Sequence, residues 1–478
     1  RTLTGRIAER EPVPGLAGQF RIKLNVANRD LYGADFVWVD DAQITTRAYP
    51  SDVAVIERAE WGPLIGTVQA LREGGRVVTS GAQAWPEIKR RLPEAARIRR
   101  EIRRIETGDI GAINHAQEGV RLRLRRLELR GVTTGPEVET LRRETAALQE
   151  RYKTQEQRLA ELRARQTATV LVAADGGKEK DLPLTQVIDV WFPNEMGVLA
   201  KTGHYVAQVW AFVSDDPRES NTEGGVFPAI FGTVMMVLIM SIAVVPLGVL
   251  TAIYMREYAK QGTFVRTLRI AVNNLAGVPS IVFGIFGLGF FVYVIGGSID
   301  QLFYPEALPT PRFGTGGILW AALTLALLTV PVVIVTTEEG LAAVPHAMRE
   351  ASLALGATKF ETLWRVLIPS ASPAILTGLI LAMARAAGEV APLMITGVVK
   401  LAPSLPLDGH FPYLHLERKF MHLGFHIYDV GFQSPNVEAS LPMVYATTLL
   451  LILIVLVLNL TAILLRNRLR RRFAAGQF

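Results

Sequence analysis

The 478-residue chain contains no cysteine, which excludes disulfide bonds, thiolate zinc sites and thiol catalysis but leaves the cellular compartment open. Residues 1–225 also lack a glycine-rich phosphate loop, clustered histidine ligands and a paired-carboxylate motif. The two histidines of that region, His115 and His204, stand alone, and isolated histidines are more often structural than functional. We therefore expect no catalytic residue, no metal site and no cofactor.

The chain is richer in apolar residues than a soluble globular protein requires, with 50% hydrophobic residues and a mean hydropathy of +0.26. This excess is uneven, because residues 1–225 are highly charged and residues 226–478 contain long apolar runs. We predict a soluble domain over 1–225 and a membrane domain over 226–478. The net charge of +7 comes mainly from basic residues flanking the apolar runs, so it does not indicate nucleic-acid binding.

Five apolar runs are long enough to cross a bilayer, which takes about 20 apolar residues per helix. They extend over residues 227–255, 270–295, 318–335, 373–399 and 441–465. Small residues and prolines interrupt them, and membrane helices tolerate both when neighbouring helices satisfy the freed backbone groups. We expect a compact bundle of helices.

The positions of lysine and arginine in the short loops predict the orientation of this bundle. Basic residues follow the first, third and fifth runs: Arg256, Lys260, Arg266, Arg269, Arg349, Lys359, Arg365, Arg466, Arg468, Arg470, Arg471 and Arg472. The segment after the second run offers only Arg312 against Asp300 and Glu306. This pattern predicts a cytoplasmic C-terminus and, with five spans, an extracytoplasmic domain over 1–225. We expect that an initiating segment with one more span precedes Arg1.

A charged helical hairpin is predicted within the soluble domain, over residues 94–166. Its arms are 94–130 and 137–166, and the second arm has a heptad repeat typical of a coiled coil. The repeat consists of Val138, Leu141, Thr145, Leu148, Tyr152, Gln155, Leu159 and Leu162. A 30-residue arm would extend roughly 45 Å. It could reach a partner or serve as a solvated support.

Strand-like segments flank the hairpin at residues 35–40, 53–57, 76–79, 169–173 and 186–190, with a turn at 175–177. They predict a small β-rich domain interrupted by the hairpin. The aromatic residues Trp38, Trp61, Trp191 and Phe192 are expected in its core, although they could instead form a sugar- or lipid-facing patch.

The segment after the third run has an unusual spacing. Gly356 lies six residues after Glu350, and Pro369 lies nineteen residues after it. The pattern resembles the cytoplasmic EAA loop of ABC-importer permeases, with Ser352 where the second alanine usually stands. Independently of the resemblance, residues 345–355 fit a short amphipathic helix that Gly356 ends. A charged short helix between spans suits docking into a groove of a soluble partner.

The resemblance assigns the coupling of ATP hydrolysis to transport to this loop, which we term the coupling loop (residues 337–370). It implicates Arg349, Glu350, Ala351, Gly356 and Pro369 in contact with an ATPase. Glu338, at the predicted end of the preceding helix, is expected either to couple that helix to the loop or to be a simple helix-end charge.

Longer stretches resemble one family more closely. The sequences SNTEGGVFPAIFGTV, NNLAGVPSIVFGIFG, VPHAMREASLALGAT and PAILTGLILAMARAAGEVAPL are similar to those of PstA-type permeases of phosphate-specific ABC importers. The similarity covers about residues 220–478, and the amino-terminal region resembles an extension of some proteobacterial members. The resemblance implies a polytopic α-helical permease of type I in the bacterial inner membrane, here with a periplasmic β-rich domain.

Arg385 and Glu389 are the sharpest candidates for substrate contact. They are four residues apart and are predicted to share one face of a membrane helix, where ionisable pairs are rare and often functional. The alternative is a structural ion pair that fixes helix register. The resemblance implies that Arg385 contacts the anion and that Glu389 pairs with it or gates the route, since guanidinium suits a tetrahedral oxyanion.

The resemblance also implies the partners of a non-enzymatic transport subunit. These are a second permease similar to PstC, an ATPase dimer similar to PstB, an extracytoplasmic phosphate-binding protein similar to PstS, and the lipid bilayer. Two alternatives stay open: a permease for sulfate or molybdate, and a membrane-anchored coiled-coil sensor or scaffold that needs no ATPase.

Overall fold

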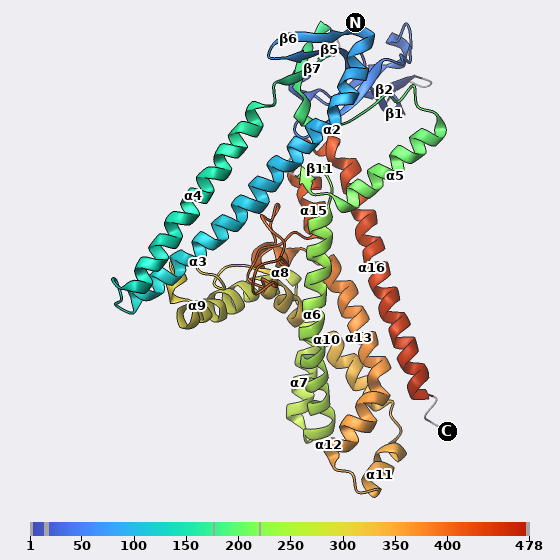
Figure 1. Cartoon of the computed structure of the whole chain (residues 1–478). Helices are drawn as coiled ribbons and strands as arrows, with labels where there is room; N and C mark the ends of the chain where they lie inside the picture. The colour runs from blue at the N-terminus through green and yellow to red at the C-terminus, as the bar shows by residue number, and fades with distance from the viewer. Residues whose placement is uncertain (1–2, 14–18, 175–176, 219–220, 475–478) are drawn as a thin grey trace. The chain divides into compact units, whose positions relative to one another are not determined.

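A computed structural model describes residues 3–13, 19–174, 177–218 and 221–474 of the chain (Figure 1). The chain folds into two compact units, Arg1–Ala211 and Phe212–Phe478. The division falls earlier than the boundary predicted at residue 225. Each unit is described by itself.

The first unit is built on antiparallel sheets, because its strands are short and joined by turns. Strands β4 (Val53–Arg58), β5 (Leu64–Glu73), β6 (Arg76–Ser80), β7 (Ala168–Ala173), β8 (Glu179–Pro183) and β9 (Val187–Trp191) form one sheet in the order β8-β7-β5-β4-β9, with β6 beside β5. Strands β1 (Arg6–Pro12), β2 (Phe20–Asn25) and β3 (Phe36–Asp40) form a second sheet, and α1 (Arg29–Tyr32) follows β2. The five predicted strands are confirmed, and β1, β2, β5 and β8 were missed. The predicted turn falls partly on residues 175–176, outside the described residues.

The core of this unit is aliphatic. Ile56, Leu64, Leu71 and Val172 from the sheet pack against helix α2 (Ala84–Arg103). The prediction that Trp38 and Trp61 are core residues is wrong. Trp38 is 38% exposed and stacks under Arg21, and Trp61 is 58% exposed in the turn between β4 and β5.

Phe192 does contribute to the core, where it packs edge-on against Trp85 with a centroid distance of 5.0 Å. A buried ion pair adds to it, since Arg58 is 1% exposed and lies 3.0 Å from Asp30. Arg58 also donates hydrogen bonds to the carbonyls of Trp61 and Gly62, in the turn between β4 and β5. The pair is thus fully hydrogen-bonded, as a buried charge requires.

The helical hairpin lies between β6 and β7. Its first arm is α2, the π-helical turn η3 (Arg104–Asp109) and α3 (Ile110–Leu129), and its second is α4 (Pro136–Ala164). Five of the eight predicted seam residues of α4 are buried and the other three are half-buried. Val138, Leu141 and Leu148 pack with Ile113, Val120 and Leu127, spaced seven apart on the first arm, and Leu159 and Leu162 pack with Ile105. Arg158–Glu101 and Arg163–Glu106 ion pairs flank the seam.

The second unit is helical, with two strand residues each in β10 (Pro217–Arg218) and β11 (Glu223–Gly224). The long helices are α6 (Phe227–Ile253), α10 (Ile318–Ala342), α13 (Ile368–Gly388) and α16 (Val437–Ala474). Shorter helices are α7 (Thr263–Leu275), α8 (Ser280–Phe286), α9 (Gly297–Phe303), α11 (His346–Ala354), α12 (Lys359–Thr362), α14 (Ala391–Thr396) and α15 (Leu423–Tyr428). Helix α5 (Val198–Ser214) runs through the division between the units.

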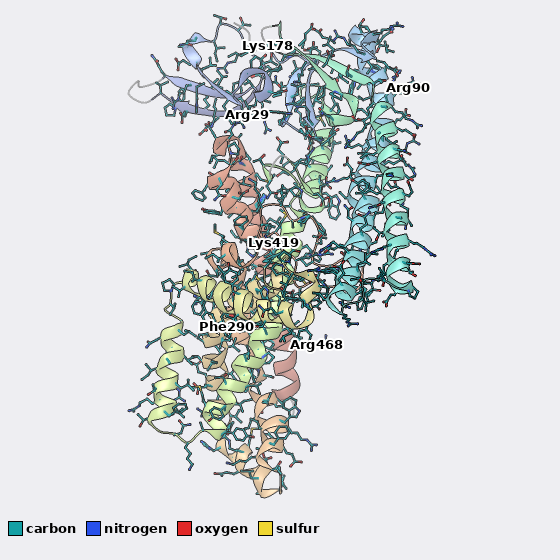
Figure 2. The ribbon with its side chains drawn as sticks, turned by 90° about the vertical axis from the view of Figure 1, so that its left-hand side faces the viewer. Arg29, Arg90, Lys178, Phe290, Lys419 and Arg468 are labelled. Atoms are coloured by element: carbon teal, nitrogen blue, oxygen red, sulfur yellow. The ribbon has the colours of Figure 1, made fainter. Side chains whose placement is uncertain are left out.

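Within the described residues, five helical segments are long and apolar enough to cross a membrane: Phe227–Tyr258, Ser280–Phe303, Ile318–Ala342, Lys359–Gly388 and Val437–Arg468. Figure 1 shows α6, α10, α13 and α16 running in similar directions, whereas the segment of α8 and α9 crosses them. Figure 2 labels Phe290 on this crossing segment. The predicted number of spans among the described residues is confirmed.

Two predicted spans differ in extent. The run 270–295 is not one helix, because Pro279 separates α7 from α8 and lacks the amide hydrogen that a continuous helix needs. The span predicted over 373–399 is displaced toward the C-terminus, because the helical segment in the structure extends over Lys359–Gly388. Helix α13 ends at Gly388, and Pro392 lies in the first turn of the next helix, α14.

Small residues allow α10 to approach its neighbours closely. A Cβ atom at Gly248 of α6 would lie 2.6 Å from Val333, and one at Gly340 would lie 2.5 Å from the Cβ of Ala374 in α13. A side chain at Gly378 would collide with Thr336. Such contacts are typical of membrane helices, where association depends on packing instead of on the hydrophobic effect.

Candidate functional site

The coupling loop folds into two short helices separated by a glycine. Helix α11 ends at Ala354, and Gly356 has φ +86°, a conformation that favours glycine. Thr358 then caps α12 through a reciprocal capping box with Glu361. Pro369 follows the π-helical turn Leu363–Leu367 at the start of α13, inside the continuous helical segment Lys359–Gly388. The predicted helix over 345–355 and its end at Gly356 match the structure.

One side of the coupling loop packs on the ends of two long helices, α10 and α6. Leu363 and Leu367 pack with Leu341 at the end of α10 and Ile253 at the end of α6. The hydroxyl groups of Ser352 and Thr362 lie 2.9 Å apart, so they link α11 to α12. The serine that departs from the EAA pattern therefore has a structural role in this loop.

The other side of the loop is apolar and exposed. Leu355 is 89% exposed, and the rings of Phe360 and Trp364 stack with a centroid distance of 6.4 Å while both remain largely exposed. Glu350 and Ala351 are exposed as well. An exposed aromatic and aliphatic patch beside charged groups is typical of a protein interface. Sequence reasoning had missed Phe360 and Trp364, although their spacing of four residues was a usable signal.

Ion pairs connect the loop and the ends of the spans. Arg349 of α11 lies 2.9 Å from Glu257, which follows α6, and Arg269 of α7 donates two hydrogen bonds to Glu338 of α10. The Glu338 carboxylate raises the pKa of Arg269 above its ordinary value. Of these side chains, Arg269, Glu338 and Arg349 line a hollow of about 480 Å³. Arg256, Gln261, Glu339 and Ala342 complete its lining.

The structure thus pairs Glu338 with Arg269 of α7 and not with α11 or α12 of the coupling loop. Arg349 nevertheless lines the same hollow, so the predicted residues Glu338 and Arg349 are neighbours. We name this group (Arg256, Glu257, Arg269, Glu338, Glu339 and Arg349) the charge cluster.

Arg385 and Glu389 also come together, with 3.4 Å between Nε and Oε1, and both side chains are partly exposed. They do not share a continuous helix, however, because Glu389 has extended backbone angles just after the last helical residue, Gly388. Arg385 lies at the end of α13 remote from the coupling loop, since the 17 residues after Ile368 span roughly 25 Å. The pair therefore lies near one end of the span.

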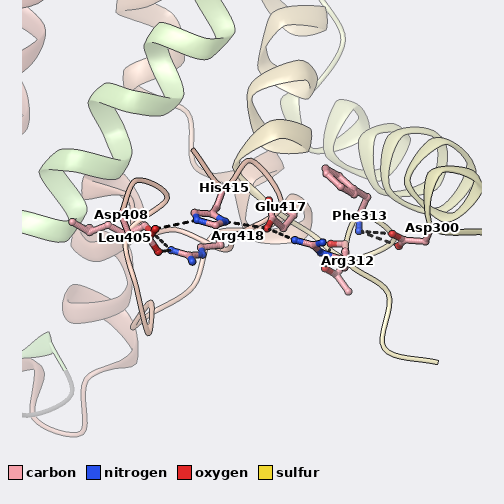
Figure 3. A network of polar contacts seen from close by, with 9 residues as sticks. Asp300, Arg312, Phe313, Leu405, Asp408, His415, Glu417 and Arg418 are labelled. Atoms are coloured by element: carbon pink, nitrogen blue, oxygen red, sulfur yellow. Dashed lines mark hydrogen bonds and ion pairs between the residues drawn. The ribbon is translucent and has the colours of Figure 1, made fainter. Parts of the chain in front are cut away.

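A polar network that sequence reasoning missed lies in the segment between α14 and α15 and in residues 300–314 before α10 (Figure 3). His415 is buried between Asp408 at 3.1 Å and Glu417 at 3.4 Å, and Glu417 pairs with Arg312 at 3.3 Å. Asp300 accepts hydrogen bonds from the amides of Phe313 and Gly314. The density of charged residues in LDGHFPYLHLERK was the available signal.

The network keeps Asp408 ionised. Burial raises the pKa of Asp408, but hydrogen bonds from the amide of His410 and the guanidinium of Arg418 outweigh that effect and hold the pKa well below its usual range. Arg418 also donates to the carbonyl of Leu405. These contacts hold the loop after α14 together internally.

Two buried histidines, His422 before α15 and His426 within it, make the stability of the chain depend on pH. Burial lowers the pKa of His422 to about 3 and that of His426 to about 4. In the unfolded chain both histidines have the ordinary histidine pKa of about 6.5. Below that pH the unfolded chain therefore binds more protons than the folded chain. The stability that these neutral histidines contribute is present above pH 6.5 and is lost as the pH falls toward 4.

We therefore expect the thermal unfolding temperature of the purified chain to fall between pH 6.5 and pH 4. The variant with both His422→Gln and His426→Gln should show a flatter pH dependence, even if it is less stable at pH 7. His115→Gln, on the exposed hairpin, serves as the matched control and should keep the parental slope. An unchanged slope in the double variant would contradict the assignment.

Residues 244–475 match the family described as binding-protein-dependent transport system inner membrane component. The phosphate transport system permease protein PstA 1 of Mycobacterium tuberculosis (strain CDC 1551 / Oshkosh) is 34% identical over 252 residues, which cover 52% of this chain and 73% of that protein. PstA of Yersinia pestis is 33% identical over 251 residues, covering 52% and 75%.

A probable ABC transporter permease protein of Bacillus subtilis (strain 168), YqgI, is 32% identical over 260 residues, covering 53% of this chain and 81% of that protein. Among solved structures, an inward-facing form of the MetNI methionine ABC transporter aligns with a TM-score of 0.37 and 18% identity, covering 55% of this chain and 98% of the other.

Proposed function

The chain belongs to the family of binding-protein-dependent transport system inner membrane components, and from that premise we propose that it is the permease subunit of an ATP-driven importer of inorganic phosphate. The observation that carries this proposal is its similarity over most of the length of two proteins that are named phosphate transport system permeases. The coupling loop, at the expected place between the third and fourth spans, supports it independently.

The coupling loop is the docking site for an ATPase subunit. Its apolar outer side, formed by Leu355, Phe360 and Trp364, suits insertion into a groove on a soluble protein. Its inner side packs on the ends of α6 and α10, so a displacement of the loop reaches both spans. The chain itself hydrolyses no ATP; it converts motion of the ATPase dimer into reorientation of the permeases.

The charge cluster transmits this motion. Arg349 joins the loop to the end of α6, and the pair of Arg269 and Glu338 joins α7 to α10. Arg269 is 41% exposed and Glu338 is 12% exposed, so solvent weakens their attraction only in part. Two connections from one loop favour movement of these helix ends as a unit.

We expect Arg269→Glu and Glu338→Arg, each made alone, to lower ATP-dependent phosphate uptake about tenfold, which corresponds to about 1.4 kcal/mol. Each change places two like charges within contact distance at the end of a span. The combined exchange should recover most of the uptake because it restores the ion pair. Recovery of uptake in the double variant would show that the ion pair itself connects α7 to α10. An additive loss of uptake would show that it does not.

The transport route runs between this subunit and a second, PstC-like permease, and each contributes half. Arg385 is the positive contact for the anion near the entry of the route, and Glu389 competes with the anion for the guanidinium. A PstS-like binding protein delivers phosphate at the same side, and a PstB-like ATPase dimer binds the coupling loop. The membrane domain lies in the bacterial inner membrane, with residues 1–225 periplasmic and the C-terminus cytoplasmic.

Phosphate selectivity is tested by ATP hydrolysis in the assembled complex in lipid. Phosphate-loaded binding protein should stimulate hydrolysis, and sulfate or molybdate with their own binding proteins should not. Stimulation by another oxyanion would reassign the substrate. Failure of the chain to copurify with any ATPase would support the scaffold function in place of transport.

A further inference from the structure

Helix α5 (Val198–Ser214) has its polar side turned inward and its apolar side turned outward. None of its 17 residues is buried. Among its residues in the first unit, His204, Gln208 and Ala211 are half-buried and the others are exposed, and the two larger half-buried side chains are polar. This arrangement is the reverse of a helix that packs on a soluble domain.

The inward side is held by specific contacts with the large sheet. His204 lies 3.7 Å from Asp189 of β9, and its ring lies 4.6 Å from that of Trp191. Gln208 donates a hydrogen bond of 3.2 Å to Glu57 of β4. His204 and Gln208 therefore fix α5 on the sheet. Their contacts also determine which side of the helix faces away from the sheet.

The outward side carries a continuous apolar surface. Its large apolar residues, all exposed, are Val198, Leu199, Tyr205, Val206, Val209 and Trp210. At 3.6 residues per turn they occupy an arc of roughly 140°. Thr202 lies within this arc, and its hydroxyl is satisfied by the carbonyl of Val198. No acidic or basic residue interrupts the arc among these described positions.

The end of α5 is tied to the start of the first span. Within the second unit, the Val226 amide donates to the carbonyl of Phe212 at 2.8 Å, and the Phe227 amide donates to the carbonyl of Asp215 at 3.2 Å. Phe227 is the first residue of α6. The last turn of α5 thus lies at the membrane boundary opposite the coupling loop.

We propose that α5 is an interfacial helix that lies in the headgroup region of the bilayer, with its apolar arc inserted among the lipids. Its 17 residues include Lys201, His204 and Gln208, and it is not among the helices of the described residues that are long and apolar enough to span a membrane. Tyr205 and Trp210 suit this depth because tyrosine and tryptophan concentrate at membrane interfaces. Lys201 is the one basic residue of the helix, so apolar insertion and not charge drives the binding. The helix thereby anchors the β-rich unit to the membrane surface.

The absence of cysteine from the chain allows a direct test. Leu199→Cys, Val206→Cys and, as the matched control on the other side of the same helix, Ala207→Cys are each labelled with an environment-sensitive fluorophore in the full chain, reconstituted in phosphatidylcholine vesicles. Quenching by brominated lipids should be at least twofold stronger at positions 199 and 206 than at position 207, and quenching by aqueous iodide should show the opposite order. Unfolding temperatures matching that of the parent chain establish that the variants fold.

Equal lipid quenching at 206 and 207 would overturn the proposal. Protection of position 206 from both lipid and iodide would also overturn it, because a protein surface would then cover the arc. Replacing the vesicles with ones containing anionic lipid should change the lipid quenching little, and a large increase would contradict insertion driven by apolar contacts. None of these outcomes depends on which anion is transported.

Discussion

Replacement of Arg385 with alanine is expected to lower ATP-dependent phosphate uptake by about 10- to 100-fold without preventing assembly of the complex. The range follows from the about 1.5–3 kcal/mol of a hydrogen bond to a charged group. Arg385 is available for such a bond because its contact with Glu389 is long, at 3.4 Å, and its side chain is partly exposed. Uptake of phosphate and copurification of the ATPase are measured on the same preparation.

Two variants separate a role in binding from a role in structure. Arg385→Lys keeps the charge but loses the planar fork of donors, so its uptake should lie between those of the alanine variant and the parent. Glu389→Gln leaves the arginine in place and frees it from its partner, so it should retain more uptake than Arg385→Ala. Normal transport by Arg385→Ala would show that Arg385 is not required for contact with the anion and has at most a structural role.

The second large effect is expected at Gly356. Valine there should lower phosphate uptake more than tenfold, because a β-branched residue at φ +86° costs about 1–2 kcal/mol and displaces the turn between α11 and α12. A Cβ atom at this position would meet nothing within 4 Å, so the effect comes from the backbone and not from a collision.

Asparagine provides the matched control for the valine variant, because it adopts the left-handed conformation more readily than other residues with side chains. Gly356→Asn should therefore retain most of the uptake and of the ATPase binding. If valine and asparagine behave alike, the conformation of Gly356 is not what the coupling loop requires.

Features with a strong local pattern could be predicted from the sequence. The seam of α4, the ends of α11 and the strand β7 depend on apolar periodicity or on a glycine, and the structure places them as expected. Arg349 was singled out because its motif lies within one short segment, and its coupling role stays a prediction. Its partner Glu257 was missed, since 92 residues separate the two.

Features set by tertiary contacts were predicted poorly. Trp38 was assigned to the core because of its size, yet it lies on an exposed sheet where Arg21 covers it. The span over 270–295 was predicted as continuous because hydropathy does not register the missing amide of Pro279. The network around His415 joins residues more than 100 positions apart, such as Arg312 and Glu417, so the charged segment 407–419 gave no indication of the distant partner.

The central claim is that this chain forms half of a phosphate route driven by ATP, and uptake of labelled phosphate into proteoliposomes containing the whole complex tests it most directly. With the binding protein outside and ATP available to the ATPase, the account predicts phosphate accumulation that requires ATP and that excess unlabelled sulfate or molybdate does not reduce. Accumulation of another oxyanion instead of phosphate, or phosphate entry that is independent of ATP, would contradict it.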